Sequence, residues 1–256
     1  MCYDLDARSP YPPISGGAAD GEDIVLTAKD GTHFGAYMAY SAKADGPQVL
    51  IYPDIRGLHQ FYKDLALRFA EVGIRALAID YFGRTAGVSP RDDKFEYEPH
   101  VQQMTIPTFL HDVTAALDYL HSKSKTPRAT FIVGFCRGGT LALHTGAEEF
   151  DLSGVIAFYA GMSRPIPGAK GSTLEQAGRN RYPVLGLFGG ADAGIPPSDV
   201  EQLDKRLDIA GVKHEIVTYP EATHGFFDRR YTEFAEQSTD AWKRVLAFIN
   251  TYSPRT

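Results

Sequence analysis

The chain has 256 residues, of which 43% are hydrophobic and 23% are charged, and its 26 basic and 32 acidic residues give a net charge of −6. This composition is typical of a globular protein, and the acidic balance argues against nucleic acid or an anionic membrane as a partner. No apolar run approaches the ~18 residues of a membrane span, and the N-terminus lacks the features of a secretory signal. We therefore expect a cytoplasmic protein that does not bind membranes.

Two antiparallel strands are expected first, "EDIVLTA" at 22–28 and "HFGAYMAY" at 33–40, joined by the turn signal at 29–31 and preceded by a loose arm at 1–21. Apolar strands and amphipathic helices then alternate. The expected strands are 48–53, 74–80, 129–135, 153–160, 183–190 and 214–220, and the expected helices are 61–73, 106–120, 138–149, 197–211 and 233–252.

A hairpin followed by alternating strands and helices predicts a mostly parallel twisted sheet with helices on both faces, in a single domain over residues 1–256. Two polar stretches, 84–103 and 163–182, interrupt the alternation and are expected to run over the surface. Ligands of such sheets bind beyond the carboxyl ends of the strands, so both insertions are expected to border the site.

Cys136 stands in the sequence "GFCRG", which is G-x-S-x-G with sulfur in place of oxygen. An apolar strand precedes it and a helix follows, which is the context that a nucleophile needs at a sharp strand-to-helix turn. The flanking glycines suit a turn with strained backbone angles. Cys2 is the only other cysteine, so we expect no disulfide framework and a reactive thiol at Cys136.

A general base and an orienting acid are expected after the nucleophile, in the order acid then histidine, each beyond a later strand. Asp192 follows the strand at 183–190, and His224 follows the strand at 214–220. The backbone N–H groups of Arg137, next to the nucleophile, and of Ile55, in the loop after the strand at 48–53, are the expected donors to an oxyanion.

Four segments in the same order resemble the dienelactone hydrolases (carboxymethylenebutenolidases) of the α/β-hydrolase fold: "YPDIRG", "DYFGR", "GFCRGG" with "GGADAGIP", and "ATHGFF". The resemblance spans about residues 22–252. It implies a Cys136–Asp192–His224 triad and an oxyanion hole at Ile55 and Arg137. It also implies that Asp54 replaces a glutamate that contacts the resting thiol in the family.

The family binds the carboxylate of its substrate with two arginines, and Arg84 in "DYFGR" matches the first of them. The second would fall at Asp228, where this chain has a carboxylate, and Arg229 follows it. The resemblance therefore leaves Arg229 and Arg137 as candidate replacements. Arg84 is equally compatible with a structural ion pair, and Arg229 with a solvated loop.

Six aromatic residues fall near the expected mouth of the site, where they would either line an apolar pocket or belong to the core. Phe226 is our candidate substrate contact among them. The six are Phe82, Phe95, Tyr97, Tyr159, Phe226 and Phe227.

We therefore expect an enzyme that hydrolyses a small ester or lactone, with a dienelactone-like, carboxylate-bearing substrate from aromatic degradation as the first candidate. No metal or organic cofactor is expected, because the chain has no H-E-x-x-H motif and no Gly-rich phosphate loop. Two alternatives stay open. One is a carboxylesterase or thioesterase acting on neutral esters, and the other is a non-enzymatic small-molecule binder or thiol redox sensor.

Overall fold

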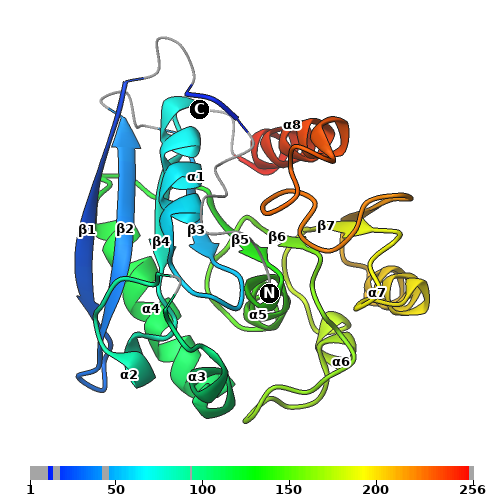
Figure 1. The fold of residues 1–256 in the computed structure, drawn as a ribbon, viewed down its shortest axis with the longest axis horizontal. Helices are drawn as coiled ribbons and strands as arrows, with labels where there is room; N and C mark the ends of the chain where they lie inside the picture. Colours follow the sequence, from blue (N-terminus) through cyan, green and yellow to red (C-terminus); the bar gives the residue numbers. More distant parts are fainter. Residues whose placement is uncertain (1–10, 14–17, 42–45, 93, 254–256) are drawn as a thin grey trace.

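The computed structural model describes residues 11–13, 18–41, 46–92 and 94–253, and its strands form one sheet in the order β1-β2-β4-β3-β5-β6-β7-β8 (Figure 1). β1 and β2 are antiparallel to each other, β2 is antiparallel to β4, and the remaining pairs are parallel. The strands are β1 Ala19–Thr27, β2 His33–Ser41, β3 Gln48–Tyr52, β4 Arg75–Ile79, β5 Thr130–Phe135, β6 Gly154–Phe158, β7 Val184–Gly189 and β8 His214–Tyr219.

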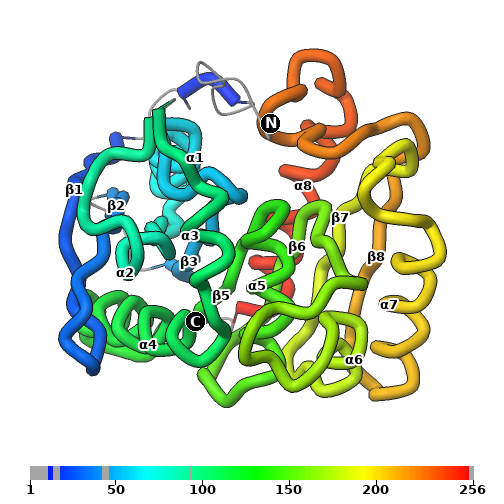
Figure 2. Tube along the Cα trace, turned by 60° about the horizontal axis from the view of Figure 1, so that its bottom comes forward, coloured from blue at the N-terminus to red at the C-terminus, as the bar shows by residue number. Residues whose placement is uncertain are grey.

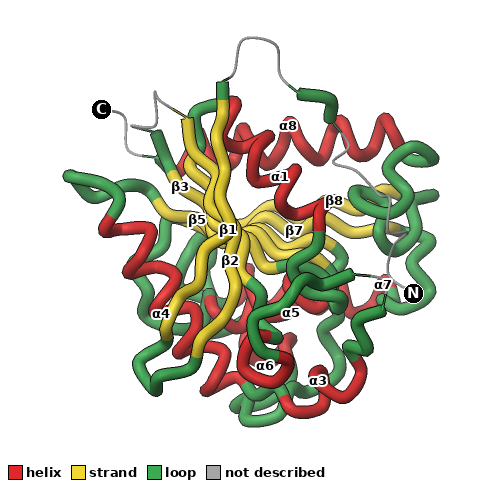
Figure 3. The backbone as a smooth tube through the Cα atoms, turned by 60° about the vertical axis from the view of Figure 1, so that its left-hand side comes forward, coloured by secondary structure: helices red, strands yellow, loops and turns green. Residues whose placement is uncertain are grey.

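Helices cover both faces of the sheet, with α1 and α8 on one face and α4 and α5 on the other (Figure 3). The hairpin of β1 and β2 forms one edge of the sheet, and β8 forms the other edge with α7 packed beside it (Figure 2). The helices are α1 Gln60–Glu71, α2 Gly83–Ala86, α3 Glu98–Gln103, α4 Ile106–Ser122, α5 Arg137–Thr145, α6 Thr173–Ala177, α7 Pro197–Ile209 and α8 Ala235–Tyr252.

Burial along the strands follows from their place in the sheet. β3, β5, β6 and β7 are buried at every position, as expected for parallel strands covered on both faces. β8, at the edge, consists of partly buried and exposed residues up to its last position, which is buried. The expected α/β-hydrolase architecture is therefore confirmed, and the carboxyl ends of the parallel strands meet at one side of the sheet.

The two insertions contain short helices that apolar periodicity did not predict, α2 and α3 in 84–103 and α6 in 163–182. A buried ion pair anchors the first insertion, because Arg91 Nη2 lies 2.6 Å from Asp80 Oδ2 directly after β4. The Arg91 guanidinium also stacks over Phe95, 4.4 Å from the ring centroid. This insertion is thus held at the carboxyl end of β4.

The expected N-terminal arm lies largely outside the described residues, and so does Cys2. β1 begins at Ala19, three residues before the strand that the sequence predicts. Among the residues that the structure describes, no helix combines the length and the apolar character needed to cross a membrane.

Candidate active site

Cys136 occupies the single residue between β5 and α5, and its side chain is partly buried. Its backbone angles are φ 53° and ψ −113°, in the left-handed half of the map that residues other than glycine rarely adopt. Such a conformation costs about 1–3 kcal/mol and persists where the surrounding structure imposes it. The Cys136 N–H donates to Phe158 O at 3.0 Å, which ties this strained turn to the end of β6.

The glycines around Cys136 allow close backbone contact on both sides of the turn. A Cβ at Gly134 would lie 2.1 Å from Gly138 O, and a Cβ at Gly138 would lie 2.2 Å from Tyr52 O and 2.3 Å from Pro53 O. The first turn of α5 therefore packs directly against the backbone at the end of β3. This contact brings the Arg137 backbone beside the loop that carries Ile55.

Asp192 and His224 meet beyond the carboxyl ends of β7 and β8. His224 Nδ1 lies 2.6 Å from Asp192 Oδ2, and the Asp192 side chain is 1% exposed while that of His224 is 27% exposed. The other carboxylate oxygen accepts the Gly194 N–H at 2.8 Å. Because an ionised carboxylate only accepts, Nδ1 carries the proton, which leaves the Nε2 lone pair as a base.

Two buried tyrosines connect the thiol, the histidine and Asp54. The Tyr159 ring centroid lies 5.0 Å from that of His224. Burial raises the pKa of Tyr159 and of Tyr81, and negative charge on Asp54 and Cys136 adds to the effect at both phenols. The Tyr81 hydroxyl donates to the Asp54 carbonyl, so Tyr81 contacts the loop after β3, while the Tyr159 ring packs against His224.

Asp54 is completely buried near the start of the loop that follows β3, and its contacts explain its position. Its Oδ1 accepts the Arg56 N–H at 2.9 Å, its backbone N–H donates to Tyr62 Oη at 3.0 Å, and its carbonyl accepts the Tyr81 hydroxyl. His59 Nε2 lies 3.8 Å from Asp54 Oδ1. The carboxylate is thus held by Arg56 and His59 of its own loop, and the Asp54 backbone is held by Tyr62 and Tyr81.

Arg137 places a partly buried guanidinium beside the thiol. Its buried Nε has no hydrogen-bond partner, and within the described part of the chain the guanidinium forms no ion pair. Burial lowers the pKa of Arg137, while negative charge on Tyr81 and Cys136 opposes that effect. A buried cation without a counter-charge is costly, so this position is suited to an anionic group supplied from outside.

Arg84 lies apart from these residues, on α2. Its Nε and Nη2 contact the Asp112 carboxylate at 2.9 and 2.8 Å, and its Nη1 lies 2.6 Å from Asp30 Oδ2. The Asp112 side chain is 1% exposed. Both faces of the guanidinium fork are therefore occupied by carboxylates, which favours the structural ion pair over the substrate contact.

Asp228 turns inward instead of facing the site entrance. The Tyr159 hydroxyl donates to its Oδ2 at 2.7 Å, the Arg229 backbone N–H donates to its Oδ1, and burial raises its pKa. The Arg229 guanidinium is partly buried and donates to His224 O at 3.3 Å. Phe226 is completely buried against Phe158, Tyr159 and Tyr219, which favours a core role.

Sequence reasoning gave no individual role to Tyr81, Tyr159 or Asp228. Both tyrosines follow the last residue of a parallel strand, β4 or β6, by one or two positions. Polar residues at such positions reach the same side of the sheet as the nucleophile, and this signal was available in the sequence. The bond between Tyr159 and Asp228 joins residues 69 apart in the chain, which no local pattern predicts.

Comparison with known proteins gives consistent matches over nearly the whole chain. The model of the "Dienelactone hydrolase family" matches residues 34–253. A protein of Methylorubrum extorquens named "putative carboxymethylenebutenolidase" is 30% identical over 254 residues, which cover 96% of this chain and 86% of that protein.

Solved structures agree with this match. The crystal structure of a "putative dienelactone hydrolase" from Klebsiella pneumoniae has a TM-score of 0.79 and 26% identity, and covers 91% of this chain and 99% of that one. A dienelactone hydrolase-like promiscuous phosphotriesterase from metagenomic libraries has a TM-score of 0.76 and 21% identity, with 93% and 100% covered. The second likeness concerns the fold alone.

Proposed function

The chain belongs to the dienelactone hydrolase family and is a hydrolase acting on small-molecule esters or lactones, and from this we propose that it works through an acyl-thiol intermediate on Cys136. The observation that carries the proposal is the pairing of His224 with the buried Asp192 at 2.6 Å, on the same side of the sheet as the strained turn of Cys136 after β5. A redox sensor or a binding protein needs a reactive thiol or a pocket, but it does not need a histidine oriented by a buried carboxylate.

In the proposed reaction, His224 Nε2 takes the proton of the Cys136 thiol, and the thiolate attacks the carbonyl carbon of the ester. The developing oxyanion accepts hydrogen bonds from the backbone N–H groups of Ile55 and Arg137. When the tetrahedral intermediate collapses, the C–O bond breaks and the leaving oxygen takes the proton from His224. In a lactone this oxygen remains attached to the acyl group.

Deacylation reverses these roles. His224 removes a proton from water, the resulting hydroxide attacks the thioester, and the C–S bond breaks with the proton returning to sulfur. Asp192 fixes the imidazole tautomer through both steps and stabilises the imidazolium that forms. We propose that Asp54 acts on the resting thiol, as the resemblance to the family implies for this position.

The experiment compares initial rates on p-nitrophenyl acetate and on a dienelactone for the wild type, Cys136→Ala and Cys2→Ala. We expect Cys136→Ala to lose activity on every substrate that the wild type cleaves, while Cys2→Ala, which removes the other thiol, retains it. Full activity of Cys136→Ala would refute the mechanism and leave the binder or sensor reading in its place.

Preference for a substrate that carries a carboxylate depends on an arginine that is available to bind it. The ion pairs of Arg84 leave Arg137 and Arg229 as the groups able to receive a substrate carboxylate, and we propose Arg137 because its guanidinium has no ion-pair partner among the described residues. Arg137→Leu should raise KM for a carboxylate-bearing lactone by about tenfold or more and spare a neutral aryl ester, since a charge-assisted bond contributes about 1.5–3 kcal/mol.

Arg181→Leu is the matched control, because that guanidinium is paired with Glu149 on the surface. Equal effects of Arg137→Leu on charged and neutral substrates would refute a carboxylate-binding role. Cleavage of the neutral ester alone by the wild type would favour the carboxylesterase alternative, which the engagement of Arg84 with Asp30 and Asp112 also supports.

A further inference from the structure

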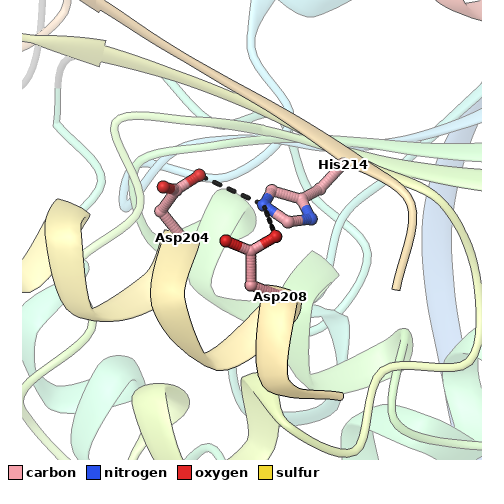
Figure 4. Close-up of side chains that lie close together, drawn as sticks. All are labelled: Asp204, Asp208 and His214. Atoms are coloured by element: carbon pink, nitrogen blue, oxygen red, sulfur yellow. Dashed lines mark hydrogen bonds and ion pairs between the residues drawn. The ribbon is translucent and has the colours of Figure 1, made fainter. Parts of the chain in front are cut away.

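A second group of ionisable side chains lies at the opposite end of β8 from the loop that carries His224. Asp204 and Asp208, one turn apart on α7, and His214, the first residue of β8, point toward one another (Figure 4). His214 Nε2 lies 3.1 Å from Asp204 Oδ1 and 3.8 Å from Asp208 Oδ1. The strand between this group and the catalytic loop is roughly 17 Å long at ~3.3 Å per residue, so the two sites are separate.

The imidazole of His214 is oriented from outside the group. Its Nδ1 lies 2.7 Å from Val212 O, and because a carbonyl only accepts, Nδ1 carries a proton. The His214 side chain is 10% exposed, so its orientation is fixed by the protein. In the neutral ring, the Nε2 lone pair then faces two carboxylate oxygens, an arrangement that a cation among the three atoms would stabilise.

The charges of the two aspartates point to the same need. Carboxylates four residues apart on a helix repel each other. In the described part of the chain, neither Asp204 nor Asp208 forms an ion pair with lysine or arginine, and His214 is their common partner. Their side chains are 52% and 75% exposed, so an ion can reach them from solvent.

We propose that Asp204, Asp208 and His214 bind a divalent transition-metal cation, with Zn²⁺ the best match to this donor set, and that the cation fastens α7 to the edge strand β8. Zinc binds imidazole nitrogen and carboxylate oxygen at about 2.0–2.2 Å, which sets neighbouring ligands of a tetrahedral site about 3.3 Å apart.

The geometry of the group fits this requirement. The two distances from Nε2, 3.1 and 3.8 Å, lie on either side of the tetrahedral value, and one ligand atom from each residue lies within 4.8 Å of the others. The hydrogen bond from Nδ1 to Val212 O is the outer contact that metal-binding histidines usually make. Water completes the coordination on the exposed side, and calcium or magnesium is a poorer match because both prefer oxygen donors.

The test is calorimetric titration of ZnCl₂ into chelator-treated full-length protein whose thiols have been alkylated, because a thiolate would bind zinc independently. We expect one equivalent to bind to the wild type, with at least a tenfold loss of affinity in His214→Gln and in Asp204→Asn. His111→Gln is the control, because His111 lies on α4, far from this group in the sequence, and pairs with Asp30 in the turn between β1 and β2.

Thermal unfolding of the same variants, with and without zinc, tests whether the bound ion stabilises the fold. Zinc should raise the unfolding temperature of the wild type and of His111→Gln, and leave that of His214→Gln unchanged. Equal zinc binding by the wild type and His214→Gln would place the ion elsewhere and overturn the proposal. Absence of binding to the wild type at millimolar zinc would overturn it as well, and would assign a proton to the space between the three side chains.

Discussion

His144 should make the protein markedly less stable in mild acid. It lies on α5 with 4% of its surface exposed, and its Nε2 is 3.1 Å from Thr173 Oγ1. Burial, with a smaller contribution from the Arg137 charge, lowers its pKa from 6.5 to about 4. The folded protein therefore holds a neutral imidazole over a pH range in which the unfolded chain takes up a proton.

The sign and size of the effect follow from this difference. Above pH 6.5 neither state binds the proton, and the contribution of His144 to stability is complete. As pH falls from 6.5 to about 4, the unfolded state binds the proton first, so stability decreases. At about 1.4 kcal/mol per pH unit, the loss from this residue reaches about 3 kcal/mol at pH 4.

Urea unfolding of the wild type and of His144→Asn at pH 7, 6, 5 and 4 measures this loss, with the fluorescence of Trp242, the only tryptophan, as the probe. Asparagine keeps a polar partner for Thr173 but does not titrate. His59, whose pKa burial lowers to about 2, acts in the same direction in both proteins and cancels in the comparison. Parallel stability curves for the two proteins would show that the folded-state pKa is not depressed and would refute the reasoning.

Three further substitutions test the site. Arg84→Met breaks the buried pair with Asp112 and should lower the free energy of unfolding, measured in urea, by about 3 kcal/mol. The KM for a neutral ester should stay unchanged. A change in KM without destabilisation would contradict the structural role. Gly138→Ala pushes the first turn of α5 away from the loop after β3. Steady-state kinetics should show a kcat about 10²-fold lower, as expected for the loss of one oxyanion donor. An unchanged kcat would count against the Arg137 N–H as that donor. Tyr159→Phe removes a donor to buried Asp228 and should cost about 2 kcal/mol in the same urea assay, whereas a neutral result would mean that the carboxylate is already protonated.

The sequence predicted the elements of the fold well because hydrophobic periodicity reports burial directly. The continuous apolar runs at β3, β5, β6 and β7 became strands buried on both faces. The periodicity does not encode which strands pair, so the insertion of β4 between β2 and β3 follows only from the structure. The short helices α3 and α6 also escaped prediction, because they have few apolar positions or only five residues.

At the site too, local patterns predicted some residues, whereas contacts between residues distant in the sequence could not be predicted. The strand-turn-helix context of Cys136 and the positions of Asp192 and His224 after later strands were readable along the chain. Arg84 could not be assigned from the sequence, because its partner Asp112 lies 28 residues away on another helix. The group at His214 could not be predicted for a similar reason, because its three side chains come from a helix and a strand and match no known sequence motif.

The edge position of β8 connects the proposed cation site with the catalytic loop. In the described sheet β8 pairs with β7 alone, and the register runs from Val184 opposite His214 to Gly189 opposite Tyr219, just before the catalytic loop. An edge strand is held by half the backbone hydrogen bonds of an inner strand, so packing of α7 against β8 matters more there. A cation joining α7 to His214 would steady the start of the strand whose end positions His224. The strand β8 would therefore link cation binding by Asp204, Asp208 and His214 to the orientation of the catalytic base His224.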